Sequence, residues 1–386
     1  MRRLAECAVT LPAMNELQAY MVHEYVADYQ AGYLHRRDLV RRVLNITGGV
    51  GSTATLLLAL GCQSSAAPSA ATSAPATSAA AKPTTAPAAS AAASPSALPV
   101  AKPVASPSAS VVPSPAPGLP IASPVASPAA SAVASPSPVA RSPLSVPAND
   151  PTIDGQDITF PGSGGATIMA YQARLKSSSG PLPLVLVCHE NRGLTEHIRD
   201  VVRRFAKEGY TACGVDLVSR QGGTAKITDP NQFSALLTGP NVNPDQFVGD
   251  FASAVAYYKT KSDLVQFDKI AMNGYCFGGG VTWRSTEQIP ELTAATPFYG
   301  AYPPLDQVTK IKAAVLGVYS SDPNDFANNM RDQLDQALTA AGVTHKFNVY
   351  PGTMHAFHND TGPAYNQDQA LAAWRDMLAW FKQYLA

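Results

Sequence analysis

The sequence predicts an α/β fold with a mostly parallel central sheet and helices on both faces of that sheet. Three observations lead to this fold class. From residue 151 onward, apolar runs of strand length alternate with segments of helical periodicity. Several runs, such as residues 182–188, are apolar throughout, which suits strands that are buried on both faces. The regular alternation of strand and helix is itself typical of parallel sheets that are covered on both sides.

The elements are expected in the following order. Residues 157–160 and 166–175 flank a Gly-rich turn and predict an opening hairpin. Further strands are expected from short apolar runs at residues 182–188, 211–217, 269–276, 294–300, 313–319 and 345–352. Helices are expected where apolar residues recur at helical spacing, namely in residues 195–210, at Phe247, Phe251, Val255 and Tyr258, and at Leu371, Trp374, Leu378 and Phe381. In such a sheet, functional residues are expected at the carboxyl ends of the strands.

Composition divides the chain into three parts. Residues 63–149 consist almost wholly of Ala, Ser, Pro and Val, and they lack the large side chains that a core needs. We interpret this segment as a disordered, semi-stiff linker with a bias towards polyproline II. Residues 150–386 are long enough for one domain with a substantial core. Acidic and basic residues are equal in number, at 28 each, so the overall charge provides no attraction to nucleic acid.

Residues 1–62 are interpreted as an export signal and membrane anchor. Arg36 and Arg37 precede Leu39 and an apolar stretch of about twenty residues. This arrangement resembles a twin-arginine export signal, and the sequence LALGC resembles the bacterial lipobox that ends in a lipidated cysteine. Cys62 is therefore the predicted lipid anchor. These resemblances predict an exported, membrane-anchored protein that lies outside the cytoplasm in a bacterial cell envelope.

The same stretch has an alternative interpretation, an uncleaved membrane helix from about Val43 to Leu60. Both interpretations tether the chain to the membrane and place the folded part outside. Residues 1–33 are long for the positively charged start of an export signal, so Met14 is an alternative translation start.

Cys276 lies at a predicted junction between strand and helix, in the sequence Gly274-Tyr275-Cys276-Phe277-Gly278. This is the Gly-x-nucleophile-x-Gly layout of a nucleophile elbow, with Cys in place of Ser. Side chains at the two glycine positions would collide with the adjoining strand and helix. The amino end of the helix stabilises a thiolate and offers the amide of Phe277 to a developing oxyanion. The layout predicts that Cys276 is a nucleophile.

A nucleophilic thiol needs a base, and in this layout an acid and then a histidine follow later in the chain. Asp322 comes just after one predicted strand, and His355 comes just after the last one. We assign His355 as the base and Asp322 as the acid that orients it, with Asp325 as the alternative acid.

Other roles for Cys276 stay open at this point. Free cysteines are commonly buried and unreactive, and in an exported protein Cys276 could form a disulfide with Cys188 or Cys213. Both of these partners lie in apolar strand runs, which favours packing over bridging. A thiol redox protein is disfavoured, because the chain has no Cys-x-x-Cys pair.

Five motifs occur in the order in which one known family carries them: VCHENRGL, DLVSRQGGT, GYCFGGG, YSSD and YPGTMHAFHND. Over residues 151–386 the chain resembles the dienelactone hydrolases, or carboxymethylenebutenolidases, which have an α/β-hydrolase fold and a Cys-His-Asp triad. The resemblance implies a hydrolase that cleaves a lactone or a small ester. It does not extend to the first third of the chain.

The resemblance also implies roles for residues of the first two motifs. Glu190 is expected to contact the thiol of Cys276 and, by raising its pKa, to keep it neutral until substrate binds. The amide of Asn191 is expected to join the amide that follows the nucleophile in an oxyanion hole. Arg220 is expected to hold a substrate carboxylate. The chain departs from the founding members at Asn359, where they carry a second carboxylate-binding arginine.

The predicted protein is therefore an enzyme that acts on a small-molecule ester or lactone without a metal or other cofactor. No two histidines have a convincing zinc-binding spacing, and we expect His189 and His358 to pack or to form hydrogen bonds. The alternative function is a non-catalytic ligand-binding module on a hydrolase scaffold that is tethered to the cell surface. The complete Cys-His-Asp set argues against that alternative.

Overall fold

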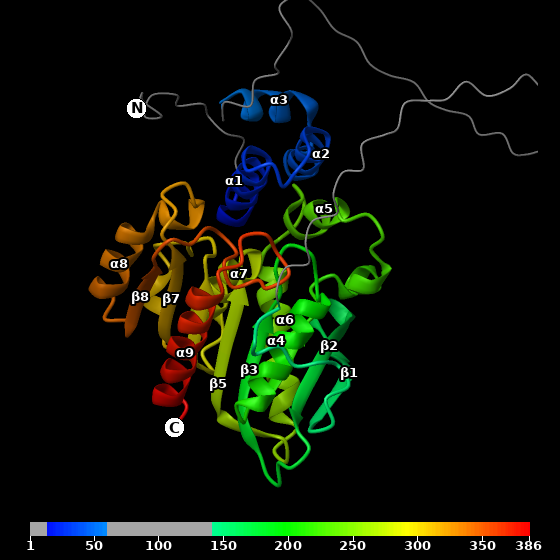
Figure 1. Ribbon diagram of the computed structural model, residues 1–386, viewed down its shortest axis with the longest axis vertical. Coiled ribbons are helices and arrows are strands. Elements are labelled where there is room, and N and C mark those ends of the chain that lie inside the picture. The colour runs from blue at the N-terminus through cyan, green and yellow to red at the C-terminus, as the bar shows by residue number, and fades with distance from the viewer. Residues whose placement is uncertain (1–13, 60–140) are drawn as a thin grey trace, which may run out of the picture. The chain divides into compact units, whose positions relative to one another are not determined.

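The computed structural model describes residues 14–59 and 141–386, and both ranges belong to one compact unit. Residues 141–386 form a main domain, and residues 14–59 form three helices that pack on it (Figure 1). Cys62 and the greater part of the predicted linker lie outside the described residues. The lipid anchor and the linker therefore stay predictions.

The centre of the main domain is an eight-stranded sheet with the order β1-β2-β4-β3-β5-β6-β7-β8. The hairpin of β1 and β2 is present as predicted, β2 is also antiparallel to β4, and all other neighbouring strands are parallel. The prediction of a mostly parallel sheet is thus confirmed. The strands are β1 (Ile153–Pro161), β2 (Thr167–Leu175), β3 (Leu182–Cys188), β4 (Thr211–Val215), β5 (Val265–Tyr275), β6 (Leu292–Phe298), β7 (Ala314–Ser320) and β8 (His345–Tyr350).

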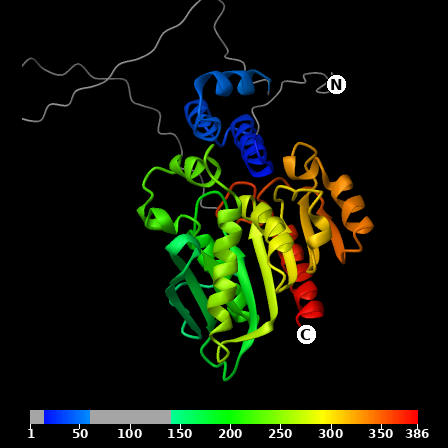
Figure 2. The ribbon, with the colours of Figure 1, turned by 180° about the vertical axis from the view of Figure 1, so that it is seen from behind.

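Helices cover both faces of the sheet, as predicted. Figure 1 shows α4 (Glu196–Lys207) and α9 (Gln367–Tyr384) on one face, and Figure 2 shows α6 (Asp245–Lys259) and α7 (Phe277–Gln288) on the other. The core lies between these layers, because each helix turns its apolar face to the sheet. In α4 the residues at the predicted helical spacing are all inaccessible to solvent, namely Ile198, Val201, Val202 and Phe205. The domain also contains α5 (Gln232–Thr238) and α8 (Arg331–Ala340).

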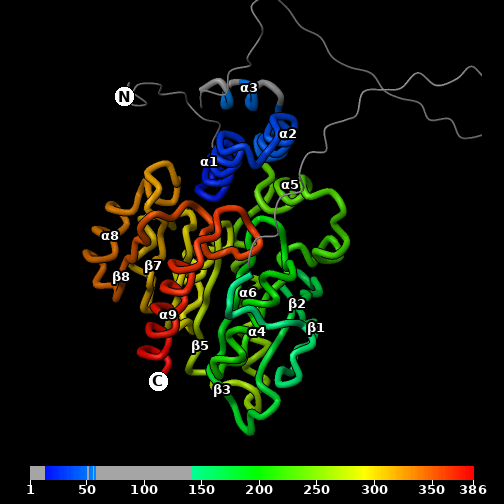
Figure 3. The backbone as a smooth tube through the Cα atoms, in the orientation of Figure 1, coloured from blue at the N-terminus to red at the C-terminus, as the bar shows by residue number. Residues whose placement is uncertain are grey.

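The N-terminal helices are α1 (Glu16–Gln30), α2 (Arg36–Thr47) and α3 (Val50–Ala59). Figure 3 shows α1 beside the loops that follow the central strands. A capping box starts α1, in which Asn15 and Gln18 each accept a hydrogen bond from the other's backbone amide. Five side chains of α1 are almost fully buried, namely Leu17, Tyr20, Met21, Val22 and Tyr25.

The predicted membrane-anchor stretch is divided between two helices. Gly48 adopts a left-handed conformation with a φ of 69° and ends α2, and α3 begins at Val50. Arg42 and Asn45 of α2 hydrogen-bond to Asn231, at 2.8 and 3.0 Å. Within residues 14–59 and 141–386, no helix combines the length and the apolar character that crossing a bilayer requires.

The last residues assigned by composition to the linker pack on the main domain. The amide of Ser142 donates to Asp360 at 2.8 Å, and the amide of Val146 donates to Asp200 at 2.6 Å. Both carboxylates are buried, so these bonds are shielded from water. The folded part therefore includes residues 142–149 in addition to the range that composition predicted.

Candidate active site

Cys276 occupies the sharp turn between β5 and α7. Its backbone has a φ of 55° and a ψ of −120°, a strained combination for a residue with a side chain. The flanking glycines are needed for the reason that the sequence indicated: a Cβ at Gly274 would collide with the carbonyl of Gly278, and one at Gly278 would collide with the carbonyl of His189. The predicted nucleophile elbow is therefore present, and Cys276 as a residue is 3% exposed.

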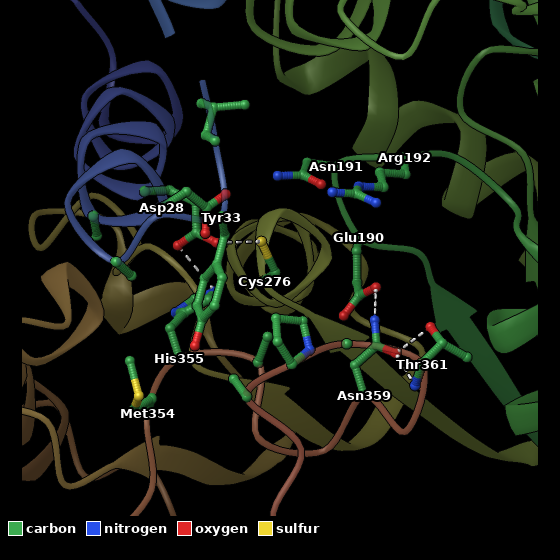
Figure 4. Close-up of a pocket in the computed structure, with 18 of the residues that line it drawn as sticks. Asp28, Tyr33, Glu190, Asn191, Arg192, Cys276, Met354, His355, Asn359 and Thr361 are labelled. Carbon is green, nitrogen blue, oxygen red and sulfur yellow. Dashed lines mark hydrogen bonds and ion pairs between the residues drawn. The ribbon is translucent and has the colours of Figure 1, made fainter. Parts of the chain in front are cut away.

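The imidazole of His355 lies beside this thiol, as predicted from two motifs about eighty residues apart in the sequence (Figure 4). The loop after β8 carries His355 to the carboxyl end of the sheet. The sulfur of Cys276, a ring nitrogen of His355 and a carboxylate oxygen of Glu24 all lie within 4.8 Å of one another. A thiol and a base are thus within reach of the same reacting atom.

The acid that contacts His355 is Asp325, the alternative candidate, and the assignment of Asp322 is wrong. Nδ1 of His355 lies 3.2 Å from Oδ1 of Asp325, whose other oxygen accepts from the hydroxyl of Ser320 at 2.6 Å. Asp322 instead accepts from the amide of Asn324 in the turn after β7. Burial acts to raise the pKa of Asp325, but His355 and its hydrogen bonds outweigh burial and hold the pKa below its usual value.

Glu190 does not contact the thiol, in contrast to the expectation from the family resemblance. Its Oε2 accepts a hydrogen bond from the side chain of Asn359 at 2.7 Å (Figure 4). Its Oε1 is buried and has no hydrogen-bond partner among the described residues. Asn359, which stands where an arginine was expected, thus fixes the carboxylate of Glu190 at the cavity wall.

Arg220 also differs from its expected role. It forms a two-pronged ion pair with the buried Asp250, with N–O distances of 2.7 and 2.9 Å. It does not line the cavity that contains Cys276. Its guanidinium is therefore engaged in holding α6 and is not free to bind a substrate carboxylate.

The carboxylate that does contact the thiol is Glu24 of α1. Its Oε1 lies 3.9 Å from the sulfur of Cys276, and its Oε2 lies 3.1 Å from Nε2 of His355. The hydroxyl of Tyr20, one turn earlier on α1, lies 2.9 Å from the same nitrogen. Neither residue was predicted from the sequence, because residues 1–62 were assigned to an export signal. The helical pattern of residues 16–30, with acidic and aromatic side chains among apolar ones, could have indicated both.

Burial and this group of charges shift the pKa values of all three partners. Burial, followed by the charge of Glu24, raises the pKa of the Cys276 thiol to about 11. Burial raises the pKa of Glu24, and the charge of the facing His355 acts in the opposite direction. Burial acts to lower the pKa of His355, but Glu24 and Asp325 outweigh it, so the imidazole titrates well above its usual range.

Of the two residues whose amides are predicted to form the oxyanion hole, Asn191 lines the cavity and Phe277 directly follows the cavity-lining Cys276. Phe277 is the first residue of α7, so its amide has no acceptor within the helix. Asn191 follows Glu190 in the loop after β3 and lines the cavity next to Cys276. The cavity has a volume of about 480 Å³, and its wall includes Glu24 and Asp28 from α1.

The donor atoms of Glu24, Cys276 and His355 are close enough to share one cation, but they are already paired with one another and with Tyr20 and Asp325. We therefore treat the group as hydrogen-bonded acid–base chemistry and assign no metal. His189 and His358 have structural roles, as expected. His189 hydrogen-bonds to backbone groups on either side, and His358 stacks on Tyr275. The three described cysteines, Cys188, Cys213 and Cys276, are free thiols.

The fold and the elbow together define an α/β-hydrolase. Residues 168–385 match the model of the dienelactone hydrolase family, and the chain belongs to that family. It is a hydrolase that acts on esters or lactones.

Individual relatives agree with this assignment. A protein of Escherichia coli K12 that is provisionally named a carboxymethylenebutenolidase is 36% identical to this chain, over 58% of this chain and 84% of its own length. A protein of Salmonella typhi with the same provisional name is 35% identical, over 64% of this chain and 94% of its own length. A crystal structure from Klebsiella pneumoniae, provisionally titled a dienelactone hydrolase, has 33% identity and a TM-score of 0.55, covering 60% of this chain and 99% of its own.

Proposed function

We propose that Cys276 is the nucleophile of this hydrolase, with His355 and Asp325 as its proton-transfer partners and a small ester or lactone as substrate. The observation that carries the proposal is the meeting of three features: a thiol on a strained elbow, an imidazole beside it, and a buried carboxylate at 3.2 Å from that imidazole. This combination is the arrangement that activates a nucleophile in covalent catalysis.

The proposed reaction proceeds in two halves. The thiol of Cys276 gives its proton to the pair formed by Glu24 and His355, and its sulfur bonds to the substrate carbonyl carbon. The amides of Asn191 and Phe277 stabilise the oxyanion, and His355 donates a proton to the leaving oxygen as the carbon–oxygen bond breaks. Water then gives a proton to His355 and attacks the thioester. The acid is released, and the leaving sulfur takes its proton back from the Glu24–His355 pair, which restores the thiol.

The cavity limits the substrate to a small molecule. A volume of about 480 Å³ lies within the range of small-molecule sites. Arg192, Glu190 and Asn359 present polar groups to the cavity (Figure 4), so the part of the substrate that faces this wall is expected to be polar.

Hydrolysis of activated acetyl esters and of a simple lactone by the purified full-length chain tests the proposal. We expect Cys276→Ala to abolish turnover and Cys213→Ala, a substitution of another buried thiol, to retain it. Equal turnover in the wild type and in Cys276→Ala would refute the nucleophile. Ligand binding without turnover in any form of the protein would favour the binding-module alternative.

A chemical label gives an independent test. Iodoacetamide followed by peptide mass spectrometry is expected to label Cys276 before Cys188 and Cys213, because these two are inaccessible to solvent inside β3 and β4. Equal labelling of the three thiols would contradict a special role for Cys276.

A further inference from the structure

Helix α1 is fixed to the main domain along its length. Glu16 pairs with Arg284 of α7 at 2.9 Å, and the side chain of Gln18 donates to two backbone carbonyls at the end of α5, at 3.2 and 2.9 Å. The carboxylate of Glu24 is 12% exposed and lies at the thiol. Because these contacts and the buried side chains of α1 attach the helix to the main domain, Glu24 is held in its position by the fold.

The hydrogen bonds around His355 determine where its protons lie. Nδ1 faces Asp325, and Nε2 faces both Glu24 and the hydroxyl of Tyr20. The hydrogen of that hydroxyl is donated to the carbonyl of Tyr299 at 2.9 Å, so its oxygen accepts from Nε2. Both ring nitrogens thus meet acceptors, and the imidazole is held as an imidazolium between two carboxylates.

We propose that Glu24, carried by the N-terminal helix α1, is a positioning residue of the active site that holds His355 as an imidazolium and keeps Cys276 as a neutral thiol in the resting enzyme. The proposal rests on the proposed function of Cys276 as nucleophile. It gives Glu24 the role for which the family resemblance indicated Glu190, whose carboxylate is taken up by Asn359.

The direction of the effect follows from charge. A carboxylate at 3.9 Å disfavours a thiolate, and the same carboxylate at 3.1 Å from Nε2 favours an imidazolium. The raised pKa values of the thiol and of His355 have Glu24 among their causes. Several titratable and charged groups face Glu24 and its two partners. They are Tyr20, Tyr25 and Asp28 of α1, Arg42 of α2, Glu190 and Arg192 of the loop after β3, Tyr299 after β6, and Asp325 of the loop after β7.

A neutral resting thiol has a chemical consequence. Alkylating agents and peroxides react with the thiolate and hardly with the thiol. Glu24 therefore lowers the reactivity of Cys276 towards small electrophiles while no substrate is bound.

The test compares Glu24→Gln, which keeps the size but removes the charge, with Glu24→Asp, which keeps the charge. The rate of Cys276 alkylation by iodoacetamide is measured by peptide mass spectrometry from about pH 6 to 10, so the readout needs no turnover. Removal of the negative charge lowers the thiol pKa, so we expect the profile of Glu24→Gln to move to lower pH by about one unit, which is about tenfold faster alkylation on the rising limb. Glu24→Asp is expected to stay near the wild type.

Glu16→Gln is the control, because it weakens the attachment of α1 without touching the site. Its alkylation profile is expected to match the wild type. The proposal is overturned if Glu24→Gln alkylates as the wild type does, or if Glu16→Gln shifts the profile as far, since a loosened helix would then explain the result. Retained turnover in Cys276→Ala would instead overturn the nucleophile, and the alkylation profiles would still report on Glu24.

Discussion

The choice of Asp325 over Asp322 leads to a sharp prediction for Asp325→Asn. Asparagine keeps the size of the side chain but removes the charge that faces Nδ1 of His355 at 3.2 Å. A hydrogen bond to a charged group contributes about 1.5–3 kcal/mol. Since about 1.4 kcal/mol corresponds to tenfold in rate, we expect kcat/KM for ester hydrolysis to fall about tenfold to a hundredfold. The pKa of His355 should fall as well, because an anion that favours the imidazolium has been removed.

Asp322→Asn is the matched control. Its side chain caps a turn through Asn324, and asparagine supports the same turn. Asp322 lines the cavity, but its carboxylate bonds to the turn and not to His355, so we expect kcat/KM within about twofold of the wild type. The assay is a pH series of initial rates with one activated ester for all three proteins. A larger loss in Asp322→Asn than in Asp325→Asn would refute the assignment.

Three further outcomes follow from the structure. Gly278→Ala should lower Tm by several degrees, because its Cβ meets backbone carbonyls that cannot move; an unchanged Tm in thermal unfolding would contradict this. Arg220→Ala should lower Tm, because it leaves Asp250 buried and unpaired at a cost of about 3–5 kcal/mol, and it should leave KM unchanged. A raised KM at constant Tm would instead show that Arg220 binds substrate. Burial acts to raise the pKa of Asp360, but its hydrogen bonds and a nearby guanidinium outweigh burial and hold the pKa well below the usual value. The contribution of Asp360 to stability is therefore present above about pH 4 and is lost as the pH falls further. Asp360→Asn should flatten the acid side of a plot of unfolding free energy against pH.

The sheet was predictable because its strands carry strong local signals. The run from Leu184 to Cys188 is apolar at every position, and the structure leaves none of these residues accessible to solvent. The hairpin, the parallel order and the helix α4 with its apolar stripe follow in the same way from periodicity. Periodicity says nothing of contacts between distant segments, so the packing of α1 and of residues 142–149 on the domain could not be predicted from it.

The site was predictable where the chemistry depends on the backbone. Cys276 needs two small neighbours to fit its turn, and that requirement is visible in the sequence as two glycines. The loop acids are different, because Asp322 and Asp325 are three residues apart and only the path of the turn decides which one faces His355. The partners of Arg220 and Glu190 were hidden for the same reason, since each is a residue more than twenty positions away in the chain.

The position of Glu24 gives the predicted processing site at Cys62 a chemical meaning. If the chain is cut there, α1 is lost together with the residues before the cut, and the thiol loses a neighbouring anion. Maturation by a single peptide cleavage would then change the working pH of the enzyme, and the precursor and the mature form would be two catalysts with different optima. Intact mass measurement of the protein recovered from cells, together with its pH–rate profile, would show which of the two the cell uses.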